Sequence, residues 1–533
     1  LLATASGLVV DRSGRSGGYG SPYLRGADPS HVVILVDGIR QNDALSSRGS
    51  AVDLTTLTIA DIERVEIVRG GSSIAYGDAL AGFIHIHTRI QAGTVAGAQA
   101  DAGGDGRVTA SVRVGTASLG ASAVSSEDGD ERGSVRNTAA NLAWRMAFGP
   151  HAGVQLNARV TRTRNTAFPD DSGGPLYAVG SALEQRVADS VQASARGWWR
   201  PSDGAALEWS LARLERSEHD DNPGVAPGVR DPAGFPPVAT DTRYRTTQLQ
   251  LLWRQRLTSA LAFVLGADVE QEQGAFDSLI QYGRLRIPAR FEQSRTPLAG
   301  FSELRYESEG WAANAGLRSL SATGYPVQWH PALSVQRPLP SAGALLGGSI
   351  TTATKLPSFY ALGHPLIGNP QLRPEQARQV ELYVASLPET ALSYRLTAFR
   401  SRYRDLIDFD AGPPPQLVNR THITVDGMEA SGAYRFASGL RFDADATRME
   451  VSGPPTAPPL RFRPRWQGGA RLALPIAAGT DLQLSARYLG RRFDSSIATG
   501  DRWLGGYAWL NATVVTTVRN AAVKDLRLSF ALD

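Results

Sequence analysis

Residues 12–23 combine cationic and aromatic side chains with a flexible backbone. Glycines there alternate with four side chains that could contact a ligand: Arg12, Arg15, Tyr19 and Tyr23. Guanidinium groups bind anionic groups in bidentate geometry, and tyrosine rings add amphipathic contact area. The segment therefore suits an anionic ligand. An ordinary glycine-rich loop with solvated arginines has the same composition, so both interpretations stay open.

Two acidic segments offer the oxygen ligands that Ca²⁺ prefers. Adjacent carboxylates occur twice, at Asp170 and Asp171 and again at Asp220 and Asp221. Adjacent carboxylates more often only keep a loop soluble. Structural calcium is therefore the minor interpretation of both segments.

Histidines offer a third kind of chemistry. His85 and His87 are two residues apart in a run with strand character, so their side chains share one face and form a possible chelating pair. No third ligand is near them in the sequence, and a structural role is favoured. His364, close to Tyr360, is a better candidate for a ligand contact, although a loop imidazole is usually only solvated.

Composition excludes several classes of protein. The 533 residues include no cysteine, which rules out disulfides, thiolate zinc sites and cysteine nucleophiles. The net charge of +4 is spread along the chain, so a nucleic-acid-binding surface is not indicated. The longest apolar runs, residues 32–36 and 472–478, are far shorter than the roughly 20 residues of a spanning helix.

Alternation with a period of two dominates the chain from about residue 95 onward. In residues 482–488, apolar and polar side chains take turns, so one face is apolar and the other is wet. Similar runs occur at residues 249–254, 440–447 and 526–530. The mean hydropathy of −0.20 is then an average over two strand faces.

The length of this region separates a membrane barrel from a soluble sandwich. Roughly 440 residues of strands and turns exceed what one sandwich holds, and no fixed internal period marks a propeller or solenoid. Long polar connections, such as residues 218–242 and 405–424, alternate with short ones, which is typical of outer-membrane barrels. We therefore predict a transmembrane β-barrel over residues 93–533.

Residues 1–92 follow a different pattern. Residues 58–64 predict a short helix with Thr58 as its N-cap. Strands are predicted at residues 32–36, 65–69 and 83–88. We expect a small mixed α/β domain.

Three stretches of this domain resemble the plug of the TonB-dependent outer-membrane transporters. They are residues 24–26, 33–42 and 62–77, the last leading through residues 79–82 into residues 84–89. Weaker similarities in the barrel region lie at residues 355–359, 368–375, 380–382, 403–407 and 426–429. The resemblance implies a barrel of about 22 antiparallel strands whose lumen is filled by the N-terminal plug.

The resemblance also implies roles for particular residues. Ligand contacts are expected from the outward-pointing plug loops and from barrel loops, namely from Arg12, Arg15, Tyr19, Tyr23, Asn42, Asp43, Arg48, Tyr360 and His364. Charged plug residues are expected to pair with the barrel wall, namely Glu63, Arg64, Glu66 and Arg69. Simple solvation of these four is the alternative.

The same resemblance also predicts a function. It implies an importer, not an enzyme, in the outer membrane of a Gram-negative bacterium, energised by the TonB–ExbB–ExbD complex. The expected ligand is a ferric siderophore or a cobalamin-like chelate, with a saccharide as the alternative nutrient. A passive porin or a barrel hydrolase are the alternatives of another class. We expect a monomer in contact with outer-membrane lipid, with no nucleic-acid partner and no cofactor besides the possible calcium.

The chain also departs from the family pattern. Gly71 stands where the family usually has proline, and His85 stands where it usually has asparagine. Neither a signal peptide, nor a TonB-box segment, nor an aromatic-ended final strand is recognisable. We therefore expect both ends to be clipped, with the final barrel strand missing.

Overall fold

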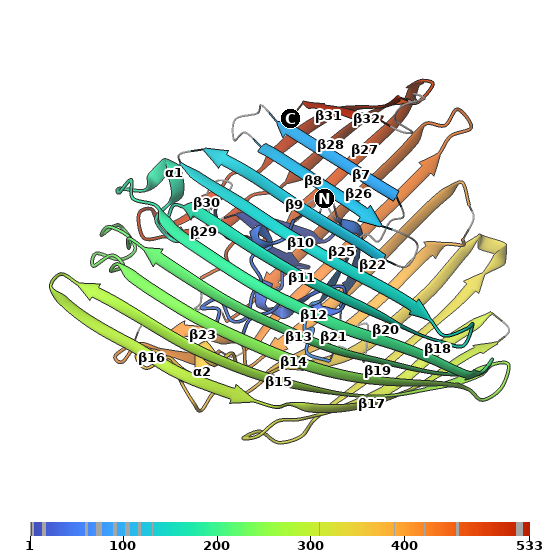
Figure 1. The fold of residues 1–533 in the computed structure, drawn as a ribbon, viewed down its shortest axis with the longest axis horizontal. Coiled ribbons are helices and arrows are strands. Elements are labelled where there is room, and N and C mark those ends of the chain that lie inside the picture. The colour runs from blue at the N-terminus through green and yellow to red at the C-terminus, as the bar shows by residue number, and fades with distance from the viewer. Residues whose placement is uncertain are drawn as a thin grey trace.

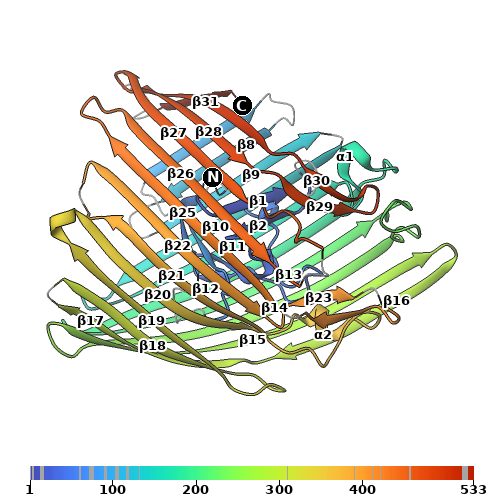
Figure 2. The same cartoon turned by 180° about the vertical axis from the view of Figure 1, so that it is seen from behind.

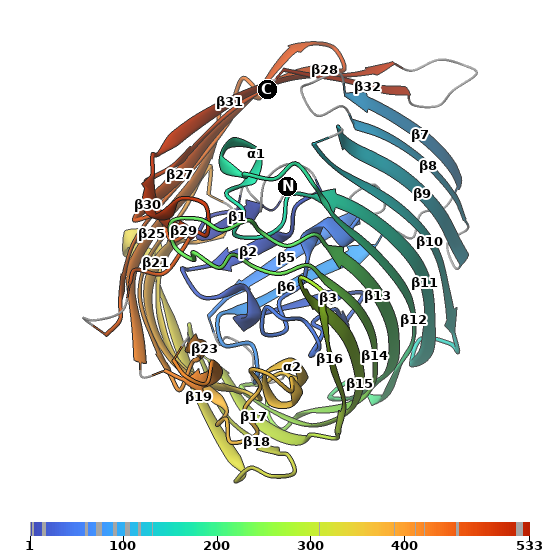
Figure 3. The ribbon, with the colours of Figure 1, turned by 90° about the vertical axis from the view of Figure 1, so that its left-hand side faces the viewer.

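The computed structural model of the chain is a β-barrel that surrounds its own N-terminal domain (Figures 1 and 3). We call this domain the plug. The structure describes residues 2, 5–12, 17–58, 62–70, 77–88, 93–101, 107–115, 119–130, 132–308, 310–388, 390–410, 412–420, 422–454, 458–518 and 526–532. Among these residues, no helix has the length and apolar content needed to cross a bilayer.

The plug contains a four-stranded sheet in the order β4–β3–β6–β5 and a separate hairpin of β1 and β2. Strands β3 and β6 are parallel, whereas β5 pairs antiparallel with β6, so the sheet is mixed. The strands are β1 (Leu8–Arg12), β2 (Gly20–Leu24), β3 (Val32–Val36), β4 (Ile39–Arg40), β5 (Ile62–Arg69) and β6 (Gly82–Thr88), and 3-10 turns occur at Pro29–His31 and Leu54–Thr56. The three strands predicted for this domain are confirmed.

The helix predicted for residues 58–64 is wrong at its C-terminal end. Residues 59–61 lie outside the described part of the chain, but Ile62 already pairs with Thr88 at the start of β5. The ladder with β6 gives the backbone of this segment its hydrogen-bond partners. This tertiary pairing outweighs the local helical spacing.

Twenty-two strands of the described chain belong to the barrel sheet. The first eleven are β7 (Gly93–Asp101), β8 (Arg107–Gly115), β9 (Leu119–Asp130), β10 (Gly133–Ala147), β11 (Ala152–Ala167), β12 (Glu184–Ser202), β13 (Ala205–Asn222), β14 (Val238–Arg256), β15 (Leu261–Tyr282), β16 (Leu285–Arg295) and β17 (Leu298–Ser308). The others are β18 (Trp311–Ser321), β19 (Gln328–Leu339), β20 (Ala344–Lys355), β21 (Glu375–Ser386), β22 (Leu392–Arg404), β25 (His422–Arg435), β26 (Arg441–Ser452), β27 (Trp466–Ala477), β28 (Thr480–Leu489), β31 (Tyr507–Val518) and β32 (Leu526–Leu532). Figure 2 shows β20–β28 from behind.

Strands β16 and β17 lie end to end along the same partner. Both pair antiparallel with β15: β16 pairs with the second half of β15, and β17 pairs with the first half. They are separated by Thr296 and Pro297, and proline lacks the N–H that a continuous ladder needs. Two of the 22 strands therefore share one position in the sheet. The expectation that a further strand follows residue 533 stays a prediction.

The barrel strands alternate between an outer apolar face and an inner polar face. On β28, Leu484 and Tyr488 are exposed on the outside, whereas Arg487 between them is buried and donates to Asp445 and to the plug carbonyl of Ala5. The same alternation on other strands exposes apolar side chains on the outer face, for example Leu156 and Val160 of β11. This pattern fits an outer surface in lipid and a wet inner surface.

The two ends of the barrel differ in the length of their connections. We call the end with long connections the loop side; it includes residues 168–183, 223–237, 356–374 and 490–506 and the described residues of 405–421 and 453–465. We call the other end the turn side; it includes residues 148–151, 203–204, 257–260, 436–440 and 478–479. The loop side carries the hairpins β23 (Ile407–Asp410) with β24 (Gln416–Asn419) and β29 (Arg492–Ser496) with β30 (Gly500–Leu504), and the helices α1 (Gly174–Tyr177) and α2 (Phe359–Gly363); a 3-10 turn at Pro340–Ala342 lies on the turn side.

Two of the predicted long connections are shorter than expected. The prediction began one of them at residue 218, but β13 continues to Asn222, which pairs with Val238 at the start of β14. The other, residues 405–424, contains the β23–β24 hairpin, and β25 begins within it at His422. Strand pairing continues into these polar segments because backbone hydrogen bonds do not depend on hydrophobic alternation.

One face of the plug sheet packs against one side of the barrel wall. Ile34, Ile84 and Ile86 form a buried cluster with Phe399 and Val425 of β22 and β25. The residues between them, such as His85, are directed to the opposite face of the sheet. The plug sheet therefore has one apolar face held against the wall, and an opposite face that is apolar at Val33, Leu35 and Phe83 and polar around His85.

Gly82 allows β5 and β6 to pair closely, and we predict that Gly82→Ala loosens the plug. Its φ is +130°, and a Cβ atom there would lie 2.1 Å from the Val68 carbonyl oxygen. We expect the plug to lose about 2 kcal/mol or more of stability and to become sensitive to protease in the folded protein. Gly180→Ala, where a Cβ atom would meet nothing within 4 Å, is the matched control. Equal protease resistance of the two variants would contradict this prediction.

Candidate functional site

The loop-side end of the plug brings arginines onto aromatic rings. The Tyr19 hydroxyl donates to the Ala51 carbonyl at 2.8 Å, which fixes the ring. The guanidinium groups of Arg48 and Arg186 lie 4.0 and 5.2 Å from its centroid. Burial raises the pKa of Tyr19, so its hydroxyl stays protonated. The predicted residues Tyr19 and Arg48 are thus in contact.

Tyr23 is built into a second pair of this kind. Its ring is buried, with Phe462 at 6.0 Å between centroids and the Arg463 guanidinium at 4.7 Å. Burial raises the pKa of Tyr23 to about 12. Arg12, at the end of β1, is exposed, and Arg15 lies outside the described residues.

Asn42 and Asp43 have mainly internal partners. The Asn42 side chain accepts from Ile34 N and donates to Val32 O, so it ties the plug loop to β3. Asp43 accepts from Leu45 N at 2.8 Å, and burial raises its pKa to about 6. Both side chains are buried, which favours a structural contribution over direct ligand contact.

Tyr360 on helix α2 and His364, which directly follows the helix, belong to an aromatic cluster with Phe276 of β15. Both rings lie 5.6 Å from the Phe276 ring, and 4.9 Å from each other. The Tyr360 backbone N–H donates to Ala44 O, so the barrel loop rests on the plug. His364 is only 8% exposed and burial lowers its pKa, so it is not the solvated loop imidazole that the sequence allowed.

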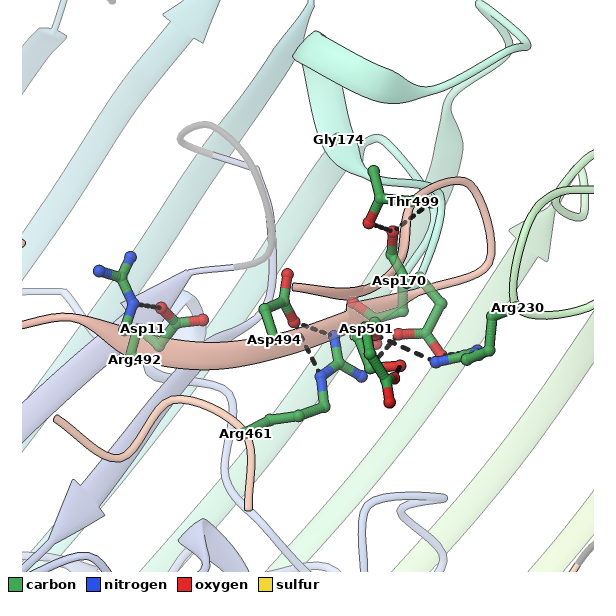
Figure 4. A network of polar contacts seen from close by, with 12 residues as sticks. Asp11, Asp170, Gly174, Arg230, Arg461, Arg492, Asp494, Thr499 and Asp501 are labelled. Atoms are coloured by element: carbon green, nitrogen blue, oxygen red, sulfur yellow. Dashed lines mark hydrogen bonds and ion pairs between the residues drawn. The ribbon is translucent and has the colours of Figure 1, made fainter. Parts of the chain in front are cut away.

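An arginine–carboxylate network links four loops to the plug (Figure 4). Arg461 contacts Asp171 at 2.6 Å and Asp494 at 2.9 Å. Arg230 contacts Asp171 at 2.8 Å. Arg492 reaches Asp11 of the plug at 4.0 Å, where burial raises the Asp11 pKa to about 6. These contacts tie the loop side together around the plug.

The four carboxylates proposed for calcium do not form one site. Asp170 pairs with Arg48, and Asp171 pairs with Arg230 and Arg461. Burial alone would raise the pKa of Asp171, but the two arginines outweigh it and the pKa is lowered. Asp220 and Asp221 are consecutive on β13, so their side chains are directed to opposite faces. Calcium binding stays a prediction.

A buried ionic cluster joins the plug to the barrel wall. The Arg25 guanidinium donates to Glu381 at 2.7 Å and to both oxygens of Glu429, at 2.7 and 3.1 Å. Arg395 donates to Glu381 at 2.9 Å, and Phe399 lies 4.3 Å below the guanidinium of Arg25. Arg25 and Glu429 are nearly inaccessible to solvent. Such a pair is costly to break, because separation leaves buried charges without partners.

The residues predicted to pair with the wall are placed differently. Arg64 pairs with Glu66 at 2.9 Å, within β5, and both are exposed. Glu63 is also exposed. Arg69 donates to the Ser6 carbonyl at 2.9 Å, close to the Arg25 cluster. Coupling through these four residues stays a prediction.

Sequence reasoning did not single out the buried ionic cluster of Arg25. Arg25 lies in the stretch 24–26, and its partners lie in the stretches 380–382 and 426–429, all three of which carried the family resemblance. The presence of all three residues in stretches that resemble the family was the signal that could have identified them. Further plug–barrel pairs join Arg40 to Glu270, Asp53 to Arg186, and His31 to Glu375.

A cavity of about 480 Å³ lies between the plug and the wall formed by β22, β25–β28 and β31. Ser6 of the plug borders it, and Arg395, Asp445 and Arg487 are among the wall residues that line it. Its lining mixes these charged side chains with alanines and Trp509.

Two family descriptions match the chain. Residues 1–83 match "TonB-dependent Receptor Plug Domain", and residues 120–533 match "TonB dependent receptor-like, beta-barrel". Among curated proteins, the vitamin B12 transporters BtuB of Photobacterium profundum and Vibrio vulnificus are 24% and 25% identical. The matches cover 80% and 81% of this chain and 69% of each relative.

Solved structures share the fold. The siderophore receptor PirA from Acinetobacter baumannii superposes with a TM-score of 0.76 at 17% identity, over 96% of this chain and 88% of that one. The copper transporter OprC superposes with a TM-score of 0.78 at 14% identity, over 99% and 87%. With both family descriptions matched in order along the chain, the protein belongs to the TonB-dependent receptors, a family of outer-membrane β-barrels.

Proposed function

We propose that the protein binds an extracellular metal chelate, either a ferric siderophore or a cobalamin-like compound, and imports it into the periplasm. The TonB–ExbB–ExbD complex would supply the energy. The observation that carries this proposal is the concentration of arginine–aromatic pairs at the loop side. A saccharide importer remains the alternative within the family.

These pairs surround the loop-side end of the plug. Besides those at Tyr19 and Tyr23, the Arg502 guanidinium lies 4.6 Å from the Tyr177 ring, and Arg491 lies 5.0 Å from the Trp503 ring. Tyr177 and Trp503 are 46% and 54% exposed. A stacked guanidinium can still donate in its own plane, so such pairs offer both a ring face and cationic donors. A planar, anionic chelate matches that surface better than a neutral sugar does.

The plug argues against a passive porin. Its buried ionic cluster and apolar face hold it inside the lumen, so transport requires work on the plug. The segment 5–7 is where such work would first act. Arg69 donates to Ser6 O, Arg487 to Ala5 O, and the Arg25 backbone N–H to Gly7 O. Tension on this segment reaches the Arg25 cluster and the wall cavity together.

We predict that exposed loop arginines contribute to ligand affinity. The double variant Arg491→Ala with Arg502→Ala should bind its chelate about tenfold more weakly, because two stacked cations are removed. Purified receptor is screened by titration against cobalamin, a panel of ferric siderophores and a set of oligosaccharides. Arg441→Ala on the turn side, where Arg441 pairs with Asp443, is the control. Saccharide binding alone would favour the alternative.

Uptake should depend on TonB. Cells that express the receptor should accumulate the bound chelate, and deletion of TonB should abolish accumulation while leaving surface binding intact. The measurement compares uptake of labelled ligand in the two strains. Uptake that persists without TonB would rule out energised import.

We predict that Arg25→Gln weakens the plug–barrel interface by about 3–5 kcal/mol, because Glu381 and Glu429 lose their shared cation. The plug should become accessible to protease, and the barrel should admit antibiotics that the wild type excludes. Arg64→Gln removes an exposed pair and should have an effect of at most about 0.5 kcal/mol. Equal effects of the two substitutions would contradict the assigned role of Arg25.

A further inference from the structure

The face of the plug sheet opposite the Ile34 cluster gathers three residues that can ligate a metal. In the β5–β6 ladder, Glu66 is directly opposite His85, and Arg64 is opposite His87. Side chains at alternate positions share a face, so Glu66, His85 and His87 all lie on the side away from the apolar cluster. The two imidazole rings are 3.9 Å apart between centroids.

The ligand atoms of the three side chains are nearly as close together as they would be around one bound ion. Their ligand atoms all lie within 4.8 Å of one another, and His87 Nε2 is 3.4 Å from Glu66 Oε2. Ligand atoms around a tetrahedral zinc ion are separated by about 3.4 Å, given bond lengths of about 2.0–2.2 Å. Small side-chain rotations would therefore close the site. Among the described residues, this is the single place where three such side chains converge.

His85 supplies a second, independent observation. Its Nε2 atom is buried and has no hydrogen-bond partner among the described residues. Buried polar atoms are normally paired, and a metal ion would satisfy this one. The imidazole nitrogens and one carboxylate suit Zn²⁺ and neighbouring divalent transition metals rather than Ca²⁺.

We propose that Glu66, His85 and His87 form a binding site for a divalent transition metal ion such as Zn²⁺. The fourth position of the ion would be open to water or to a ligand of the ion. The site is on the turn side, because Thr88 borders the same cleft as Gly120 and Ser122 at the turn-side end of β9. A metal would reach it from the end of the barrel opposite the arginine-rich loops.

Arg64 competes with the ion for the same atoms. It donates to Glu66 Oε1 at 2.9 Å, and its Nη2 lies 3.5 Å from His87 Nε2. The side chain of Arg64 is 59% exposed, so it can turn into solvent when an ion binds. Removal of this cation should therefore strengthen metal binding, whereas a site that is only a surface ion network would show no such effect.

The test is a Zn²⁺ titration of the full, untagged chain in detergent, followed by calorimetry, with Co²⁺ absorption as a probe of coordination. The wild type should bind one ion. His85→Gln, His87→Gln and Glu66→Gln should each weaken binding at least tenfold, the double histidine variant should abolish it, and Arg64→Gln should tighten it. Unchanged electrophoretic heat modifiability verifies that each variant is folded.

His219→Gln is the matched control, because His219 is an exposed histidine with one carboxylate partner, Asp241, at 2.9 Å. It should bind Zn²⁺ like the wild type. Equal affinity in the double histidine variant and the wild type would overturn the proposal, as would an equal loss in His219→Gln. Because the readout is binding of the free ion, the result is independent of whether the receptor imports a chelate.

Discussion

A buried ionic cluster around Arg25 holds the plug against the barrel wall. The guanidinium of Arg25 is shared by Glu381 and Glu429 on two different barrel strands, and it stacks on Phe399. The interior of a barrel of this size would be an open channel without a plug. The buried ionic cluster fixes the plug in place, because removal of one member leaves buried charges without partners.

The rest of the interface is arranged around that cluster. Apolar contacts between the plug and the wall include the cluster against β22 and β25 and smaller ones at Ile39 and at Leu45, while Ser6 of the plug and polar wall side chains border a cavity beside the first cluster. Lost hydrogen bonds in a wet interface can be replaced by water, so the polar side is the easier one to open. The opposite face of the same sheet carries Glu66, His85 and His87 beside the smaller apolar cluster of Val33 and Leu35.

Much of the architecture was predictable from local patterns. Period-two alternation identified β14, β26, β28 and β32, because the two faces of a barrel strand meet different solvents. The apolar run at residues 32–36 identified β3. The prediction of a helix at residues 58–64 was wrong at its C-terminal end, because pairing with β6 determines that segment. The predicted limits of the long connections were wrong because strand pairing continues into polar sequence.

For the candidate sites too, some features were predictable from the sequence and others were not. The sequence by itself determined the family, the barrel and the types of side chain near the ligand, since these follow from composition, alternation and motif order. Only the tertiary structure decided which charges meet: Arg25 finds carboxylates 356 and 404 residues away, and Glu66 joins His85 and His87 through strand register alone. Pairings between distant segments depend on register and burial, which local sequence does not encode.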